Sequence, residues 1–253
     1  MKRLFSLMCC LAISSLTLQA ASAQATATKP SADEVIAKAI KASTGGKGFG
    51  DIKSLVATGE MSIPQVGIAG KMKVSQTADG KGLIEISLPG VGDQKMGSDG
   101  ETYWEFSQVT GGNILEGDRA EQIKLQIQIG ALEKYKEYFD SVECTGEEEF
   151  EGMKCYVIVS KKEGSDPMTD YFAVDSGLHV GSKIKAATPM GKLEVVSVMS
   201  DYKDVDGFKM SHKTVGKLPN GMTQEVKITS YKINGKIDDK TFDLPDEIKA
   251  LKK

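Results

Sequence analysis

The stretch TPMGKLEVVSVMSDYKDVDGFKMSHKTV, residues 188–215, decides how this chain folds. Its Asp206-Gly207 dipeptide is typical of a two-residue hairpin turn, which makes the flanking segments antiparallel partners. Val205 then lies opposite Phe208, and the pairing continues outward along both arms. One face of this hairpin is largely apolar, whereas the other carries opposite charges near the turn and is apolar again farther away. The hairpin therefore belongs to a sheet that needs apolar contacts on both of its faces.

The same turn fixes the other cross-strand pairs that we expect. They are Lys203 with Met210, Asp201 with His212, Met199 with Thr214, Val195 with Leu218, Asp204 with Lys209, Ser200 with Lys213 and Val198 with Val215. Only the pair of Asp201 and His212 has acid–base character. It is either a catalytic couple or a structural polar contact.

Alternation of apolar and polar residues recurs along most of the chain, with Gly, Asn and Asp at the turns between the runs. About four strands are expected between residues 52 and 106. Seven more are expected at about 141–147, 153–161, 168–174, 178–186, 191–202, 207–216 and 222–233. Consecutive strands joined by short turns predict a meandering antiparallel sheet.

Two helical segments interrupt the strands. The first begins at Ser31, which forms a capping box with Glu34, and it ends at Gly45. The second covers about 118–139, where Gly130 favours a kink or a break. The element order predicts an α+β fold with about 11 strands. A short docking segment with a few helical residues follows the last strand.

The N-terminus has the features of a secretory signal. Met1-Lys2-Arg3 is basic, an apolar stretch follows, and Ala21-Ser22-Ala23 offers the small residues that a signal peptidase needs. We expect residues 1–23 to be a signal peptide, residues 24–30 a flexible leader and residues 31–253 a single domain. The mature chain is then soluble and lies in the periplasm or is secreted.

The charge argues against two classes of partner. The formal net charge is −3, and loss of Lys2 and Arg3 with the signal peptide takes it to −5. Nucleic acid and anionic membrane surfaces call for a concentrated positive field, so nucleic acid is not expected as a partner. Arg119 is then the only arginine left, which argues against bidentate recognition of phosphate or carboxylate.

Two cysteines, Cys144 and Cys155, remain after processing, and export makes a disulfide between them possible. They flank a turn at Glu151-Gly152. A strict two-residue turn would pair Cys155 with Glu148, so a bond to Cys144 requires a wider, bulged loop. No C-x-x-C spacing exists, which argues against a redox role.

Methionine is frequent in the predicted strands, at positions Met72, Met168, Met190, Met199, Met210 and Met222. Thioether side chains adapt to irregular apolar partners, which suits a surface that meets a ligand. The alternative is that they fill the core between a twisted sheet and its helices.

Three stretches together resemble a known family: TDYFAVDSGLHVGSKI (169–184), GKLEVVSVMSDYKDVDGFKMSHKT (191–214) and ITSYKINGKIDDKTFDLP (228–245). Their order of strand, D-x-G-L turn, strand, D-V-D-G hairpin and closing F-D-L-P is similar to that of outer-membrane lipoprotein-sorting-like proteins, relatives of the LolA and LolB carriers. The resemblance covers about 31–248 and includes the helical GDRAEQIKLQIQIGALEKY (117–135).

This resemblance implies a curved, incomplete antiparallel β-barrel, lidded by helices over an apolar cavity that takes lipoprotein acyl chains in the carriers. The partner would be a lipid or a lipidated protein, with transient contact to a membrane or an envelope protein. The side chains predicted to line the cavity are Met72, Val74, Ile84, Ile86, Trp104, Phe106, Val195, Met199, Phe208 and Met210.

No metal-ligand spacing or serine-hydrolase elbow occurs in the sequence, so neither an enzyme, a cofactor nor a metal is predicted. The leading hypothesis is an exported binding protein that holds an apolar ligand and acts in envelope lipid or lipoprotein transport. An envelope sensor or protein-interaction module with a self-filled core is the alternative.

Overall fold

The computed structural model describes residues 29–188 and 191–252, so the predicted signal peptide and most of the predicted leader lie outside the described residues. Within those two ranges, thirteen strands form one antiparallel sheet in the order β6-β5-β4-β3-β2-β1-β13-β12-β11-β10-β9-β8-β7. The strands are β1 (Ser54–Ile63), β2 (Ile68–Thr77), β3 (Gly82–Leu88), β4 (Gly92–Ser98), β5 (Tyr103–Ser107), β6 (Gly111–Ile114), β7 (Ser141–Phe150), β8 (Met153–Lys161), β9 (Met168–Ala173), β10 (His179–Thr188), β11 (Gly191–Val205), β12 (Phe208–Lys217) and β13 (Thr223–Ile233). Pairing of β1 with β13 joins two meanders, and β6 and β7 are left as edges of a sheet that does not close.

The strands after residue 140 match the prediction closely, whereas the earlier part contains six strands where about four were expected. The additional strands include β4, which reads GDQKMGS, and β6, which reads GGNI. Both are short and rich in glycine, so neither shows the apolar alternation by which a strand is recognised. The fold is mostly β, with few helices.

The register of the opening hairpin is confirmed. Val205 pairs with Phe208, and Met199 pairs with Thr214, as the Asp206-Gly207 turn requires. The left-handed turn conformation appears at Asp206, with φ of 53°, and at Gly207, with φ of 87°. Two positive φ values in succession are the signature of a tight hairpin turn, which explains why this dipeptide fixed the pairing.

The helices form the second class of element. They are α1 (Ala32–Thr44), α2 (Gly117–Ile127), α3 (Tyr135–Tyr138) and α4 (Asp246–Leu251), with 3-10 turns η1 (Pro64–Val66) and η2 (Asp239–Phe242). The predicted capping box is present at Ser31 and Glu34, and α1 ends at Gly45 in the left-handed conformation. The second helical segment is broken at Gly130, which has φ of 69°, so α2 and α3 are separate helices.

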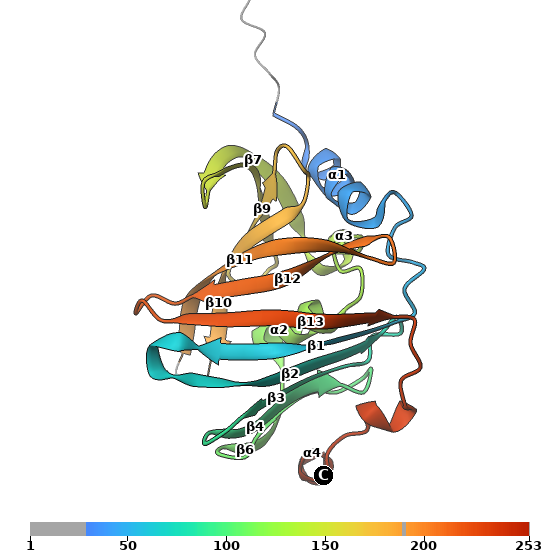
Figure 1. Ribbon diagram of the computed structural model, residues 1–253, viewed down its shortest axis with the longest axis vertical. Coiled ribbons are helices and arrows are strands. Elements are labelled where there is room, and N and C mark those ends of the chain that lie inside the picture. Colours follow the sequence, from blue (N-terminus) through green and yellow to red (C-terminus); the bar gives the residue numbers. More distant parts are fainter. Residues whose placement is uncertain (1–28, 189–190, 253) are drawn as a thin grey trace, which may run out of the picture.

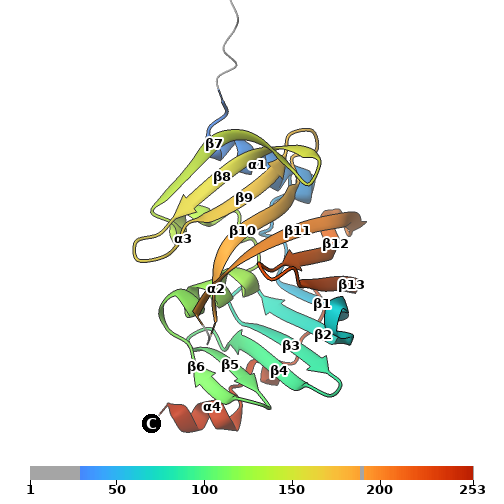
Figure 2. The same cartoon turned by 90° about the vertical axis from the view of Figure 1, so that its left-hand side faces the viewer.

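The sheet curves around α1, α2 and α3, which lie on its concave side (Figures 1 and 2). Helix α1 packs at the β7 end, where Phe172 and Ile158 of the sheet meet its apolar stripe. Helix α2 packs at the other end through Ile123 and Ile127, which are buried against β3. The C-terminal segment with η2 and α4 contacts β3 and β6 at that same end of the sheet.

Cys144 and Cys155 are both free and buried, so the possible disulfide is not seen. Cys155 pairs with Glu148, as a tight turn requires, and Cys144 pairs with Ile158. The cysteines also lie on opposite faces of the sheet: Cys144 packs with α1, whereas Cys155 packs with a separate cluster around Phe150. A bulge after Cys144 is present but does not bring the two sulfur atoms together.

The curvature of the sheet depends on close approaches between strands at glycines. A Cβ atom added at Gly70 of β2 would lie 2.0 Å from the carbonyl oxygen of Ser87, and one at Gly97 of β4 would lie 2.2 Å from that of Gly82. Backbone atoms cannot move aside as a flexible side chain can. Glycine at such positions allows a sheet to bend where a larger residue would force the strands apart.

We predict that Gly70→Ala lowers the free energy of unfolding by about 2 to 3 kcal/mol, because the added methyl group collides with the backbone of β3. Gly216→Ala on β12 is the matched control, since its added Cβ would have no neighbour closer than 3.8 Å. The control should change stability by less than about 0.5 kcal/mol. Urea unfolding followed by circular dichroism measures both, and equal midpoints for the two variants would refute this account of the curvature.

Candidate functional site

A cavity of about 700 Å³ lies between the concave face of the sheet and the helices. Its roof comes from α1, α2 and the segment around α3. Its floor comes from β2, β3 and β8 to β12. The apolar side chains that line it are Ile36, Met72, Val74, Ile84, Leu125, Ala131, Leu132, Tyr135, Tyr138, Phe139, Ile158, Pro167, Met168, Phe172, Ile184 and Met199. This volume lies within the range of small-molecule sites in proteins.

Four of the side chains predicted to line the cavity do so: Met72, Val74, Ile84 and Met199. Ile86 faces the same side but is buried in the core under α2. Val195 is the cross-strand partner of the lining residue Ile184 and is not itself part of the lining. Phe208 and Met210 pack at one end of the sheet against Ile52 and Ile129.

Trp104 and Phe106 lie on the opposite face of the sheet, which corrects their predicted place. Trp104 is 2% exposed and packs with Phe242, Leu244 and Ile248 of the C-terminal segment. Phe106 packs against the same cluster. Trp104 and Phe106 of β5 therefore anchor the C-terminal segment on the outer face. The sequence pattern of TYWEF does not reveal this. It shows that Trp104 and Phe106 share one face of β5, but not whether that face is the concave or the outer face of the sheet.

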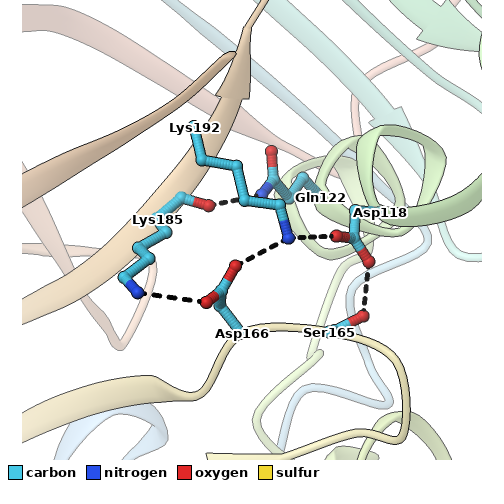
Figure 3. Close-up of polar contacts among 6 residues, drawn as sticks. All are labelled: Asp118, Gln122, Ser165, Asp166, Lys185 and Lys192. Atoms are coloured by element: carbon cyan, nitrogen blue, oxygen red, sulfur yellow. Dashed lines mark hydrogen bonds and ion pairs between the residues drawn. The ribbon is translucent and has the colours of Figure 1, made fainter.

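Six polar residues join α2 to β10, β11 and the β8–β9 loop. We call them the clasp: Asp118, Gln122, Ser165, Asp166, Lys185 and Lys192. Figure 3 shows Lys192 of β11 reaching between two carboxylates. Its Nζ lies 2.9 Å from Oδ2 of Asp118 on α2 and 2.7 Å from Oδ2 of Asp166 in the β8–β9 loop. This lysine thus bridges three elements that are distant in the sequence.

The remaining contacts of the clasp reinforce that bridge. Ser165 Oγ donates to Oδ1 of Asp118 at 2.6 Å, and Gln122 Nε2 donates to the carbonyl oxygen of Lys185 at 3.0 Å. Lys185 Nζ also lies 3.2 Å from Oδ1 of Asp166. The Lys192 side chain is 46% exposed and the Asp118 side chain 27% exposed, so the clasp lies at the boundary between the cavity wall and solvent.

The two carboxylates of the clasp are ionised near neutral pH. The hydrogen bond from Ser165, followed by that from Lys192, lowers the pKa of Asp118. The hydrogen bonds from Lys192 and then Lys185 lower the pKa of Asp166. A carboxylate with a lowered pKa contributes stability above its ordinary pKa and loses it as the pH falls through the lowered value. As the pH falls, the clasp is therefore weakened only when the solution is strongly acidic.

The polar pair that lines the cavity is not the predicted pair of Asp201 and His212. Asp201 pairs with Lys203 at 2.9 Å, and His212 Nδ1 lies 3.0 Å from the carbonyl oxygen of Met210, so Asp201 and His212 form no couple. Asp201 has φ of 53°, which interrupts the regular ladder at that residue. Instead, His179 Nε2 lies 2.8 Å from Oδ1 of Asp170, and both side chains line the cavity.

Sequence reasoning missed Asp170, His179 and the clasp. Asp170 and His179 both fall within the run TDYFAVDSGLHVGSKI, where a turn lies between them. The spacing of nine residues across a hairpin was the available signal for this pair. No comparable signal exists for Lys192 and Asp118, which are 74 positions apart. In the described part of the chain, no three His, Cys, Asp or Glu side chains gather as ligands for a metal ion.

Within the described ranges, no helix is both long enough and apolar enough to cross a lipid bilayer. No family model matches the sequence, and no curated protein matches it at a significant level.

Solved structures do match the fold. A LolA superfamily protein from Nitrosomonas europaea superimposes with a TM-score of 0.58 at 13% identity, over 85% of this chain and 98% of that chain. A domain assigned to the outer membrane lipoprotein-sorting proteins of Vibrio parahaemolyticus gives a TM-score of 0.57 at 14% identity, over 88% and 100%. A DUF1329 family protein from Desulfovibrio piger gives 0.58 at 13% identity, over 84% and 97%. None of these three is named as an enzyme. At such identities the match concerns the fold alone, and the chain has the fold of the LolA superfamily proteins.

Proposed function

We propose that this protein is an exported binding protein that holds an apolar chain, from a lipid or from the acyl group of a lipoprotein, between its sheet and its helices. The observation that carries the proposal is the cavity of about 700 Å³, which the helices leave unfilled. Both its floor and its roof are lined mainly by apolar side chains. Each methylene group moved from water into such a space contributes about 0.8 kcal/mol.

Helix α2 is the element that would open and close over the ligand. One side of it is held to the sheet by the buried Ile123 and Ile127 and by Arg119, whose Nη2 donates to Glu105 Oε2 at 2.6 Å. Its other side is held by the clasp through Asp118 and Gln122, and by Glu121, whose Oε2 lies 2.9 Å from Nζ of Lys162. Release of these polar contacts would free the second side alone, so the helix would swing rather than detach.

The setting that fits this activity is the cell envelope. The basic and apolar N-terminal segment is typical of a secretory signal, and one structure of the same fold is assigned to lipoprotein sorting. The partner would then be a lipid or a lipidated protein, met at a membrane or on an envelope protein. Residues 31–253 would act as a single domain in that role.

We predict that Thr214→Trp lowers the affinity for an acyl probe at least about ten-fold, because the indole would occupy space that the acyl chain needs. Thr214 lines the cavity from β12. Displacement of a fluorescent fatty-acyl probe measures the affinity, and native mass spectrometry of the protein from periplasmic expression detects the ligand that it carries.

Thr229→Trp on the neighbouring β13 is the matched control, because Thr229 is exposed and outside the cavity lining. It should bind the probe as the unmodified protein does. A ligand-free mass together with no binding of any acyl probe would remove the proposed function in favour of a sensor or interaction module.

We also predict that Lys192→Met speeds release of a bound acyl probe about three- to ten-fold, since two partly exposed ion pairs are lost with one side chain. Added salt should speed release from the unmodified protein in the same direction, because mobile ions screen partly exposed charges. Stopped-flow fluorescence after mixing with excess unlabelled competitor gives the rate.

Lys203→Met is the control for the clasp. Lys203 lies on the same strand, pairs with Asp201 at 2.9 Å and does not line the cavity. It should leave the release rate unchanged. Equal rates for Lys192→Met and Lys203→Met would show that the clasp does not govern access to the cavity.

A further inference from the structure

The cavity is not uniformly apolar, because a row of polar side chains crosses its floor. Ser182 of β10 lies directly opposite Asp170 of β9 and Ser197 of β11 in the register of the sheet. Residues that lie directly opposite each other present their side chains on the same face, and all three line the cavity. The wall formed by β2 and β3 carries Met72 and Ile84 instead. The floor of the cavity is therefore apolar along β2 and β3 and carries its polar row across β9, β10 and β11.

Asp170 is the acidic member of this row, and the row's preference for a ligand depends mainly on it. It is only 9% exposed, and its Oδ1 accepts a hydrogen bond from Nε2 of His179 at 2.8 Å. An ionised carboxylate accepts about four hydrogen bonds, so this contact leaves capacity for further donors. A carboxylate removed from water is costly unless donors surround it. A ligand that reaches the row gains most if it donates hydrogen bonds.

The charges around the cavity supply no net positive site for an anion. Each basic side chain among the described lining residues is already engaged with a carboxylate: Lys162 with Glu121 at 2.9 Å, Lys185 with Asp166 at 3.2 Å and His179 with Asp170 at 2.8 Å. Whether or not the imidazole carries a second proton, its pair with a carboxylate has no net positive charge. An anionic head group at the row would face Asp170 without a net positive charge to attract it.

We propose that the cavity selects amphiphiles whose head group is uncharged and donates hydrogen bonds, as in acyl amides and acylglycerols, over those whose head group is anionic. The acyl chain lies along the wall of β2 and β3, and the head group meets the row of Asp170, Ser182 and Ser197. This inference rests on the proposed function and adds to it the class of ligand.

The test compares four probes that share one acyl chain: N-palmitoylethanolamine, monopalmitoylglycerol, methyl palmitate and palmitate. Each displaces a fluorescent monoacylglycerol from the purified protein. N-palmitoylethanolamine and monopalmitoylglycerol are the two hydrogen-bond donors. We expect them to bind at least about ten-fold more tightly than palmitate, because a hydrogen bond to a charged group contributes a difference of that size. Methyl palmitate, which is uncharged but donates nothing, should bind more weakly than the two donors.

Asp170→Asn keeps the size of the side chain and removes its charge. The preference for the donors over palmitate should then fall to within about three-fold. Asp175→Asn is the matched control, because Asp175 is exposed in the β9–β10 turn, outside the cavity lining. Ser182→Ala provides a second variant in case Asp170→Asn does not fold, and it should weaken the donors while leaving palmitate unchanged. Circular dichroism establishes that each variant is folded.

The outcomes separate this inference from the function on which it rests. Palmitate binding as tightly as the donors would overturn the inference and leave an apolar-ligand carrier standing. An unchanged preference in folded Asp170→Asn and Ser182→Ala would remove the polar row as its source. Absence of binding by all four probes would remove the proposed function and this inference together.

Discussion

A sheet with two apolar faces has to be covered, and the described part of this chain supplies few and short helices for the purpose. Helix α1 covers the concave face near β7, and α2 covers it near β3. The outer face around β5 is covered by the C-terminal segment, through Phe242 and Ile248. Between these two contacts the helices roof the concave face without filling the space above it, and this space is the cavity. The site is thus a consequence of how the sheet is covered, not a separate feature added to it.

The sheet leaves its two edge strands, β6 and β7, unpaired with one another, so backbone hydrogen bonds do not close the barrel. Side chains instead link two parts of the sheet across its concave face. Helix α2 is held to β5 by Arg119 and to β11 by Lys192. A barrel closed by a ladder could open only by breaking that ladder, whereas side-chain contacts between α2 and the sheet can break and leave every strand paired. An arrangement of this kind suits the proposed admission and release of a ligand.

The features that the sequence predicts well are local ones. The Asp206-Gly207 turn fixes its own register, and the capping box at Ser31 fixes the start of α1, because both depend on backbone preferences within a few residues. Which face a strand turns inward depends on distant partners. Trp104 illustrates this, since its place was decided by the C-terminal segment more than a hundred residues away. The clasp lies beyond sequence reasoning for the same reason: charged residues are common on strands, and nothing local distinguishes Lys192 from the others.

The two attachments of α2 differ in strength, and this difference indicates how the proposed opening of the cavity would proceed. On the β3 side, Ile123 is 0% exposed and Ile127 is 1% exposed, and full burial of such a side chain contributes about 1.5 to 3 kcal/mol. On the β11 side, the ion pairs of Lys192 are partly exposed, and pairs of that kind contribute about 0 to 1 kcal/mol each. The clasp therefore yields before the apolar attachment does. On the proposed function, opening on that side would expose the polar row of β9, β10 and β11 first, so the head group of a bound amphiphile would enter last and leave first.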